Sequence, residues 1–214
     1  MRFILFDLDG TLIDSTEAIL YGFRKTFETF GRVPPKDEDV KKLIGLPLDV
    51  MFANLGIEEK VEEFVQTYKN IYKVIAKDMT VLLPNAKEAI LLAKSFARLG
   101  IVTTKTGIYS KELLEHFGVM KYFEVLIGRE DVKNPKPHPE PVLRALHLMN
   151  ANKESAWMIG DTCLDMLSAK EAGIKSVAVE FEYDKKLHEC AEIIKKDALK
   201  AVEFIKNYSE KEKA

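Results

Sequence analysis

Asp7 and Asp9 are two carboxylates that stand two residues apart at the end of a short apolar run, Phe3 to Phe6. Alternation along an extended chain points both side chains to the same side, and Gly10 allows a tight turn directly after them. Two acids this close repel each other unless a cation or a shared proton lies between them. The segment therefore predicts an acid pair with a bound cation or proton. An acidic turn that caps a helix is the alternative interpretation.

Asp161 and Asp165 form a second acidic pair, which follows the apolar run Trp157 to Ile159 and Gly160. A spacing of four residues places both carboxylates on one face of a helix. If this pair lay opposite the first one, the two would enclose a pocket of oxygen ligands, and such a pocket favours Mg²⁺. Taken alone, Asp161 could instead be a helix N-cap.

Two further segments could hold an anion. Thr103 and Thr104 follow the apolar pair Ile101-Val102 and offer hydroxyl groups, and backbone N–H groups of the next turn could bind a phosphate. Lys136 stands among four prolines within residues 134–141, so its flexible ammonium is carried on a stiff backbone. An ordinary strand end and a solvated loop lysine are the alternatives.

Short apolar runs predict the strands that must position these residues. The runs are Phe3–Phe6, Ile101–Val102, Val125–Ile127, Trp157–Ile159 and Ser176–Val179. Helical spacing fills the intervals, at 111–117, 140–149 and 164–172 and in a helix that opens at Asn85 and ends near Gly100. This alternation predicts an α/β fold with a Rossmann-like parallel sheet. Ligands of such sheets bind beyond the carboxyl ends of the strands, where Asp7, Thr103 and Asp161 fall.

Residues 14–81 interrupt the alternation, because they contain helical patterns and no convincing strand. The patterns run from a capping box at Asp14-Ser-Thr-Glu17 to Phe30, and over 36–43, 47–55 and 58–77. We therefore predict a helical cap domain, 14–81, inserted into a Rossmann-like catalytic core, 1–13 and 82–214. Two adjacent connections would make a hinge. Helices packed on the sheet without independent motion are the alternative.

Composition limits the classes of protein. The chain has 214 residues, 47% hydrophobic and 31% charged, which excludes disorder and small disulfide scaffolds. Its formal charge of −2 offers no attraction to nucleic acid or anionic membranes, and no apolar run is long enough for a signal peptide or a membrane span. Cys163 and Cys190 lack metal-type spacing and are interpreted as thiols in a reducing compartment. We expect a cytoplasmic monomer or homodimer without nucleic-acid or membrane partners.

The motifs together resemble the haloacid dehalogenase-like superfamily of phosphatases, and within it the phosphoglycolate phosphatase-like branch with a helical cap. The matching stretches are residues 6–15, 101–105, 136–139 and 159–165, in the order of that family and with roughly its spacing. The resemblance covers nearly the whole chain, including the cap.

The resemblance implies that Asp7 is the nucleophile, which forms an aspartyl-phosphate, and that Asp9 protonates the leaving group and then activates water. The groups implied to hold the phosphoryl group are Thr103, Thr104 and Lys136. The groups implied to bind Mg²⁺ are the Asp7 carboxylate, the Asp9 backbone carbonyl and Asp161, with Asp165 supporting them through water or Lys136. Charge balance agrees, because carboxylates beside a phosphate need the charges of the metal and the lysine.

A small phosphate monoester is the substrate class that this resemblance implies, and the best single candidate is 2-phosphoglycolate, hydrolysed to glycolate. The loop Leu43–Leu48 and the capping helices carry that choice. Arg32, Lys41 and Lys42 are candidates to hold the glycolate carboxylate, although a solvated surface charge is the plainer interpretation of each.

Several alternatives stay open. A pyrophosphatase, a sugar-phosphate phosphatase or a phosphomutase would share the catalytic core. A mutase is disfavoured, because Leu48 stands where the mutase-type cap carries an arginine. Outside the enzymes, a receiver-like phospho-acceptor or a phosphate-binding regulatory module also uses strand-end acids, Thr and Lys, but it would not need the insertion at residues 14–81.

Overall fold

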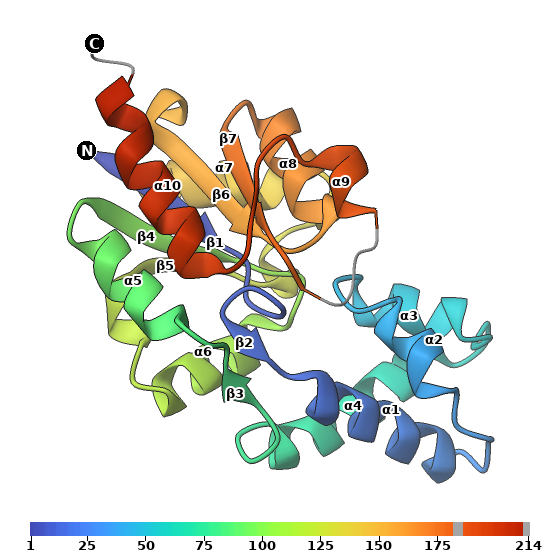
Figure 1. Cartoon of the computed structure of the whole chain (residues 1–214). Coiled ribbons are helices and arrows are strands. Elements are labelled where there is room, and N and C mark those ends of the chain that lie inside the picture. Colours follow the sequence, from blue (N-terminus) through green and yellow to red (C-terminus); the bar gives the residue numbers. More distant parts are fainter. Residues whose placement is uncertain (182–185, 212–214) are drawn as a thin grey trace.

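Six parallel strands form the central sheet of the computed structural model, which describes residues 1–181 and 186–211 (Figure 1). In spatial order they are β5 (Phe123–Ile127), β4 (Ala97–Val102), β1 (Arg2–Phe6), β6 (Ala156–Gly160), β7 (Lys175–Val179) and β8 (Ile194–Lys195). The inner strands are apolar and buried on both faces, as strands of a covered parallel sheet must be. The predicted fold class is therefore confirmed.

Helices cover both faces of this sheet. One face carries α5 (Ala86–Lys94) and α10 (Ala198–Lys211), and the other carries α7 (Glu140–Leu148) and α8 (Cys163–Ala172). The remaining core helices are α6 (Gly107–His116), α9 (Leu187–Cys190) and the 3₁₀ turns η1 (Met120–Tyr122), η2 (Arg129–Asp131) and η3 (Lys153–Ser155). Alternate residues of β1 supply the two cores, with Ile4 facing α5 and α10 and Leu5 facing α7 and α8. Within the described residues, no helix is both long and apolar enough to cross a membrane.

The helix predicted from Asn85 to near Gly100 is too long. The structure ends α5 at Lys94 and begins β4 at Ala97, so Gly100 lies inside a strand. This glycine provides space instead of ending a helix, because a Cβ at Gly100 would come within 2.8 Å of the Val125 side chain on the neighbouring strand. In the sequence, a glycine that ends a helix cannot be told from one that provides packing space in the following strand.

Four helices lie beside the sheet and form the region predicted as the cap (Figure 1). They are α1 (Thr16–Thr29), α2 (Asp37–Lys41), α3 (Leu48–Asn54) and α4 (Val61–Ile75). Their shared core is aromatic: the Phe23 ring lies 4.6 Å from that of Phe52 and 5.0 Å from that of Tyr68, measured between ring centroids. We call residues 14–81 the cap from here on.

A short antiparallel ribbon joins the cap to the core. Its strands are β2 (Ile13–Asp14) and β3 (Val81–Leu82), and Ile13 pairs with Leu82. Strands of two residues carry too little pattern to be found in a sequence, and both were missed. The ribbon places the entry to the cap and the exit from it side by side, at the two predicted connections.

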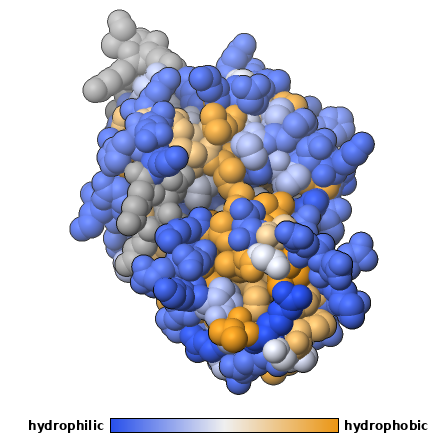
Figure 2. Space-filling view, turned by 90° about the vertical axis from the view of Figure 1, so that its right-hand side faces the viewer, coloured by the Kyte–Doolittle hydropathy of each residue, from blue (hydrophilic) through white to orange (hydrophobic). Residues whose placement is uncertain are grey.

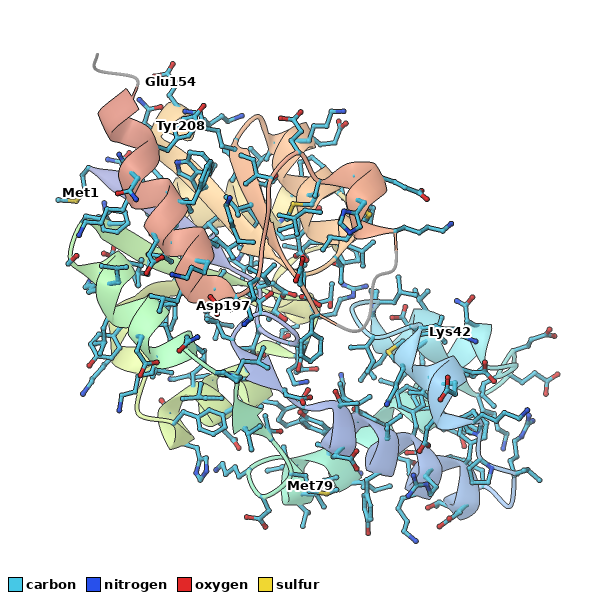
Figure 3. The ribbon with its side chains drawn as sticks, viewed as in Figure 1. Met1, Lys42, Met79, Glu154, Asp197 and Tyr208 are labelled. Atoms are coloured by element: carbon cyan, nitrogen blue, oxygen red, sulfur yellow. A yellow bond between two sulfur atoms is a disulfide. The ribbon has the colours of Figure 1, made fainter. Side chains whose placement is uncertain are left out.

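The strands run toward the cap. Met1 and Glu154, which precede β1 and β6, lie at the end of the core that is far from the cap, whereas Lys42 and Met79 lie on the cap (Figure 3). Because the strands are parallel, the carboxyl end of each one faces the boundary between core and cap. Strand-end side chains are therefore placed where a substrate could be enclosed.

Hydrophobic side chains gather along the middle of the face that lies to the right in Figure 1, from the core to the cap (Figure 2). A cleft between the two regions is lined by Leu46, Pro47 and Val50 of the cap and by Pro135, Pro137 and Leu167 of the core. Val50 and Leu167 are 38% and 40% exposed. Core and cap thus meet across an apolar cleft that is partly open to solvent.

Cys163 and Cys190 form a disulfide, so their interpretation as thiols is wrong. The reason is spatial, because α8 begins at Cys163 and the short helix α9, which ends at Cys190, returns beside it and brings the two Cα atoms to 5.6 Å. The sequence separation of 27 residues gave no sign of this return. The cysteine-based argument for a reducing compartment falls with it.

Candidate active site

Asp7 lies directly after β1 and is only 5% exposed. Its backbone N–H donates to the Ile159 carbonyl at 2.8 Å, which extends the ladder between β1 and β6 by one residue. On the other side, Phe6 is paired with Ile101 of β4. Residues that follow β1, β4 and β6 therefore emerge side by side, as the apolar runs predicted.

Asp7, Asp161 and Asp165 form a buried acidic cluster. Each offers one carboxylate oxygen, and these three oxygens lie within 4.8 Å of one another. Asp161 Oδ1 accepts a hydrogen bond from Thr11 Oγ1 at 3.0 Å, but Asp161 Oδ2 is buried and has no hydrogen-bond partner in the part of the chain that the structure describes. A buried carboxylate oxygen without a partner is costly. A hard divalent cation such as Mg²⁺, which takes carboxylate oxygens as ligands, fits this cluster.

Two glycines make room for the acidic cluster. Gly10 has a φ of +78°, and a Cβ there would lie 2.2 Å from Asp161 Oδ2. At Gly160, a Cβ would lie 2.3 Å from Asp165 Cγ. A side chain at either position would therefore collide with a carboxylate, that of Asp161 at Gly10 and that of Asp165 at Gly160. At Gly10 the left-handed backbone also favours glycine.

Lys136 provides the positive charge in this cluster. Its Nζ lies 2.8 Å from Asp7 Oδ1, donates to Asp165 Oδ1 and donates to the Val102 carbonyl at 3.1 Å. The Lys136–Pro137 peptide bond is cis. Burial disfavours the charged ammonium, but the carboxylates of Asp165 and Asp7 outweigh burial and raise the pKa of Lys136. The lysine therefore stays protonated and offsets one negative charge.

One ammonium does not balance three buried acids. Burial raises the pKa of Asp7 from its ordinary 3.8 to about 7, against the opposing effect of Lys136. Burial and then the charges of Asp7 and Asp165 raise the pKa of Asp161 well above its ordinary value. A divalent cation favours the ionised form of carboxylates and would shift both pKa values downward.

Thr162, and not Asp161, is the N-cap of α8, so the N-cap interpretation of Asp161 is wrong. The Thr162 backbone N–H and hydroxyl donate to Asp165 Oδ2 at 3.1 and 2.8 Å. Because the cap is made by the next residue, the Asp161 carboxylate is left for the acidic cluster. Asp165 is held at both oxygens, by Thr162 on one side and by Lys136 on the other.

Asp9 faces the cap and not the acidic cluster. Its carboxylate oxygens lie 3.1 and 3.0 Å from Lys105 Nζ, and Ser15 Oγ donates to Asp9 Oδ1. Burial disfavours the Lys105 charge, but Asp9 and Tyr72 outweigh burial and raise the pKa of this ammonium. The capping box predicted over residues 14–17 is formed only in part: the Asp14 carboxylate accepts from the Thr16 backbone N–H at 2.9 Å, but the N-cap of α1 is Ser15, whose hydroxyl is used on Asp9.

The two threonines after β4 point to different places. Thr103 is 4% exposed, and its hydroxyl oxygen accepts a hydrogen bond from the Lys105 backbone N–H at 3.2 Å. The Thr104 hydroxyl donates to the Gly45 carbonyl in the cap at 2.7 Å. Thr103 thus lies at the strand end beside Asp7, whereas the Thr104 side chain joins core to cap.

A small cavity of about 50 Å³ lies between cap and core beside Asp9. It is lined by Asp9, Thr104, Lys105, Thr106 and Tyr109 of the core and by Ile19, Ile44, Gly45, Leu46, Leu48, Met51, Tyr68, Lys69 and Tyr72 of the cap. Its cations are Lys69 and Lys105, to which the sequence analysis gave no role. Lys105 carried no local signal, because its partner Asp9 is 96 residues away in sequence.

The cations expected to reach a substrate carboxylate from the cap do not line this cavity. Lys42 makes an exposed ion pair with Asp39, and Lys41 is likewise absent from the lining. The Arg32 guanidinium lies 5.9 Å from the centroid of the Phe64 ring. The structure therefore directs attention to Lys69 and Lys105.

The family of the chain follows from comparison with known proteins. Residues 4–179 match the haloacid dehalogenase-like hydrolase family. Pyrophosphatase PpaX of Halalkalibacterium halodurans is 36% identical over 179 residues, which cover 83% of this chain and 83% of that protein. The chain belongs to the haloacid dehalogenase-like hydrolase family, and the predicted resemblance and the predicted phosphatase-type enzyme class are confirmed.

Solved structures agree with this assignment. A haloacid dehalogenase-like hydrolase from Bacteroides fragilis superimposes with a TM-score of 0.86 at 29% identity, over 92% of this chain and 98% of that one. A predicted phosphoglycolate phosphatase from Haemophilus somnus gives a TM-score of 0.87 at 21% identity, over 95% and 97% of the two chains. At that identity the second likeness shows the fold alone.

Proposed function

We propose that this protein is a Mg²⁺-dependent phosphatase that hydrolyses a small phosphate compound through an aspartyl-phosphate on Asp7. The observation that carries the proposal is the buried cluster of Asp7, Asp161 and Asp165, held around the Lys136 ammonium at the end of β1. The proposed nucleophile and a fixed positive charge are in direct contact there, and three carboxylate oxygens lie within 4.8 Å of one another, as a cation site requires. Asp9 stands next to them on the cap side.

The Asp7 carboxylate, the Asp9 backbone carbonyl and Asp161 are the proposed Mg²⁺ ligands, and Asp165 supports them through its contact with Lys136. When bound, the metal supplies positive charge against the phosphoryl oxygens and the nucleophile. Lys136 and Thr103 hold the transferring phosphoryl group, and Thr104 could add only its backbone N–H, because its hydroxyl donates to the Gly45 carbonyl of the cap. Without these charges, a carboxylate would not approach a phosphate dianion.

In the first step, an oxygen of Asp7 attacks phosphorus, and the bond from phosphorus to the leaving oxygen breaks. The proton that this leaving oxygen needs comes from the Asp9 carboxyl. Ser15 and Lys105 fix the orientation of Asp9 through its two carboxylate oxygens. The products of this step are the aspartyl-phosphate and the protonated leaving group.

In the second step, water attacks the same phosphorus and gives a proton to Asp9. The bond between phosphorus and the Asp7 oxygen breaks, inorganic phosphate leaves, and both aspartates return to their starting state. Both displacements use the same charged pocket, so one arrangement of Lys136 and Asp161 serves both.

Pyrophosphate is the first substrate that we propose. Support comes from the relative named pyrophosphatase, which is 36% identical over 83% of each chain. 2-Phosphoglycolate is the second candidate, because the loop 43–48 and the capping helices resemble those of phosphoglycolate phosphatases. The small size of the cavity, about 50 Å³, disfavours a sugar phosphate, whose leaving group is larger than a phosphate or a glycolate. A cytoplasmic location and a monomeric or homodimeric state remain predictions.

A panel of phosphate compounds, assayed with Mg²⁺ and with EDTA, tests the proposal. We expect Mg²⁺-dependent release of phosphate, with the highest kcat/KM for pyrophosphate or 2-phosphoglycolate. Steady turnover also excludes the receiver-like alternative, which would give one burst of acyl-phosphate without continued release. A flat profile over the panel would refute both substrate assignments and leave the phosphatase assignment standing.

A further inference from the structure

We propose that Lys105 and Tyr72 form a specificity subsite that binds an oxyanion carried by the leaving group. The inference rests on the proposed function, because it concerns the half of the substrate that departs when Asp7 takes the phosphoryl group. A leaving group with a phosphate or a carboxylate is the chemistry that this subsite would select.

Lys105 is in the right place for this role. Its Nζ lies 3.0 and 3.1 Å from the two Asp9 oxygens, on the side of Asp9 that faces the cavity below the cap. Asp9 is the group that gives its proton to the leaving oxygen, so the leaving group must lie against Asp9. Any second anionic group of a small substrate then falls within reach of the ammonium of Lys105.

Tyr72 supplies an independent sign that a ligand is missing from this cavity. The residue is 2% exposed and lines the cavity from α4. Its hydroxyl lies near enough to the Lys105 ammonium to help raise the pKa of that group, but it makes no hydrogen bond of good geometry among the described residues. A buried hydroxyl without a partner costs free energy that a bound acceptor would recover. The Lys105 Nζ lies 4.6 Å from the centroid of the Tyr72 ring, so one oxyanion could contact the ammonium and the hydroxyl together.

The charges on the cap side indicate an anion and not a neutral group. Lys69, which is half-buried on α4, adds a second ammonium to the cavity and has no ion-pair partner among the described residues. The cavity therefore carries two ammonium groups and one carboxylate, Asp9, and the other lining residues are uncharged. An oxyanion would balance this excess, whereas an alcohol or a sugar would leave it unbalanced.

A matched pair of substrates distinguishes binding of the leaving-group oxyanion by Lys105 from an effect of Lys105 on all substrates. 2-Phosphoglycolate and 2-hydroxyethyl phosphate differ only in having a carboxylate or a CH₂OH group on the leaving side, and pyrophosphate adds a leaving phosphate. For Lys105→Met, we expect kcat/KM to fall about 10-fold to 100-fold for the two anionic substrates, as for the loss of a charge-assisted hydrogen bond. 2-Hydroxyethyl phosphate should lose only the part of kcat/KM that depends on how Lys105 orients Asp9, so the ratio of kcat/KM for 2-phosphoglycolate to that for 2-hydroxyethyl phosphate should still fall about 10-fold.

Controls define the other outcomes. Lys105→Arg should recover part of the selectivity for the anionic substrates, and Lys111→Met, on the exposed face of α6, should leave all three rates unchanged. Tyr72→Phe should reduce the same selectivity by about threefold to tenfold, and it tests the subsite if Lys105→Met does not fold. Equal losses of kcat/KM on all three substrates would show that Lys105 only positions Asp9, and would overturn the subsite.

The subsite and the proposed function fail in different ways. If the wild-type protein releases phosphate with Mg²⁺ but has no preference for the anionic member of the pair, the subsite is refuted and the phosphatase stands. If no compound in the panel is hydrolysed with Mg²⁺, the proposed function is refuted, and the subsite falls with it.

Discussion

The two sides of Asp9 are built in different ways. On the core side, Asp7 and Asp161 follow neighbouring parallel strands, and the sheet register places them before any side chain is considered. On the cap side, the cavity is lined by side chains from several separate elements, and the Thr104 hydroxyl bonds across to the cap loop. The core side is dense in buried charge, whereas the cap side combines apolar side chains with the ammonium groups of Lys69 and Lys105.

This difference separates two tasks. Transfer of a phosphoryl group needs fixed charges at fixed distances, and strand ends of a rigid sheet supply them. Selection of a leaving group needs a surface whose residues can be substituted without moving the catalytic charges. The inserted cap supplies such a surface. Substitutions on the core side should therefore change the rate with every substrate, while those on the cap side should change the ranking of substrates.

The largest effect is expected for Asp7→Asn, which removes the nucleophile. We expect kcat to fall at least about 10³-fold for every substrate, because the amide cannot form the aspartyl-phosphate. Phosphate release in the presence of Mg²⁺ measures this loss, and thermal unfolding verifies that the variant is folded. Normal turnover by this variant would refute the proposed mechanism.

The next effect is on stability. Lys136→Met leaves the Asp7 and Asp165 carboxylates buried without their shared ammonium, so the free energy of unfolding should fall by about 3 kcal/mol in the metal-free protein. Urea unfolding in EDTA measures this loss. Adding Asp165→Asn should recover part of it, because one of the uncompensated charges is gone. Equal stability of the single variant and the wild type would contradict the charge balance described for the cluster.

The acidic cluster also predicts a dependence on pH. Asp7 has a pKa near 7 when folded against an ordinary 3.8, so between these values the metal-free folded state binds more protons than the unfolded one. Its stabilising contribution is complete below about pH 4 and is lost as the pH rises toward 7. Mg²⁺ binds ionised carboxylates, so the rise in Tm that it causes should be larger near pH 8 than near pH 5.

Thermal unfolding at the two pH values, with EDTA or with excess Mg²⁺, measures this dependence. Asp161→Asn is the matched variant, because it removes one buried charge and one proposed metal ligand together. We expect a higher Tm in EDTA and a smaller gain from Mg²⁺ than in the wild type. A gain that is the same at both pH values would argue against a metal held by the acidic cluster.

The smallest effect is expected on the cap side. Thr104→Val removes the hydroxyl that donates to Gly45 and keeps the shape of the side chain. The loss of one such hydrogen bond is worth about 1 kcal/mol, which should appear as a rise in KM of a few-fold with little change in kcat. Steady-state kinetics with pyrophosphate measure both constants. A large fall in kcat would instead place Thr104 at the phosphoryl group.

Local patterns in the sequence predicted the core side well. Apolar runs that end in Asp7, Thr103 and Asp161 mark strand ends, and strand ends of a parallel sheet gather at one edge. Those patterns were sufficient because each residue is positioned by its own strand. They failed at Gly100, where a glycine that provides packing space resembles one that ends a helix.

The cap side was harder to predict, because its contacts join residues that are distant in sequence. Lys105 reaches Asp9 from 96 residues away, and Thr104 reaches Gly45 from 59 residues away. Neither pairing leaves a periodic or motif-like signal in either segment. The same reason explains the disulfide between Cys163 and Cys190, whose partners meet only once α9 has folded back beside α8.

The ribbon of β2 and β3 has a consequence for how such a molecule can vary. Because Asp14 and Val81 are paired, everything between them leaves and rejoins the sheet at one point. A segment whose two ends meet can be exchanged, lengthened or shortened while the remaining chain keeps its alignment. New preferences for the departing half of a substrate could therefore be grafted onto unchanged reaction chemistry, one exchangeable segment at a time.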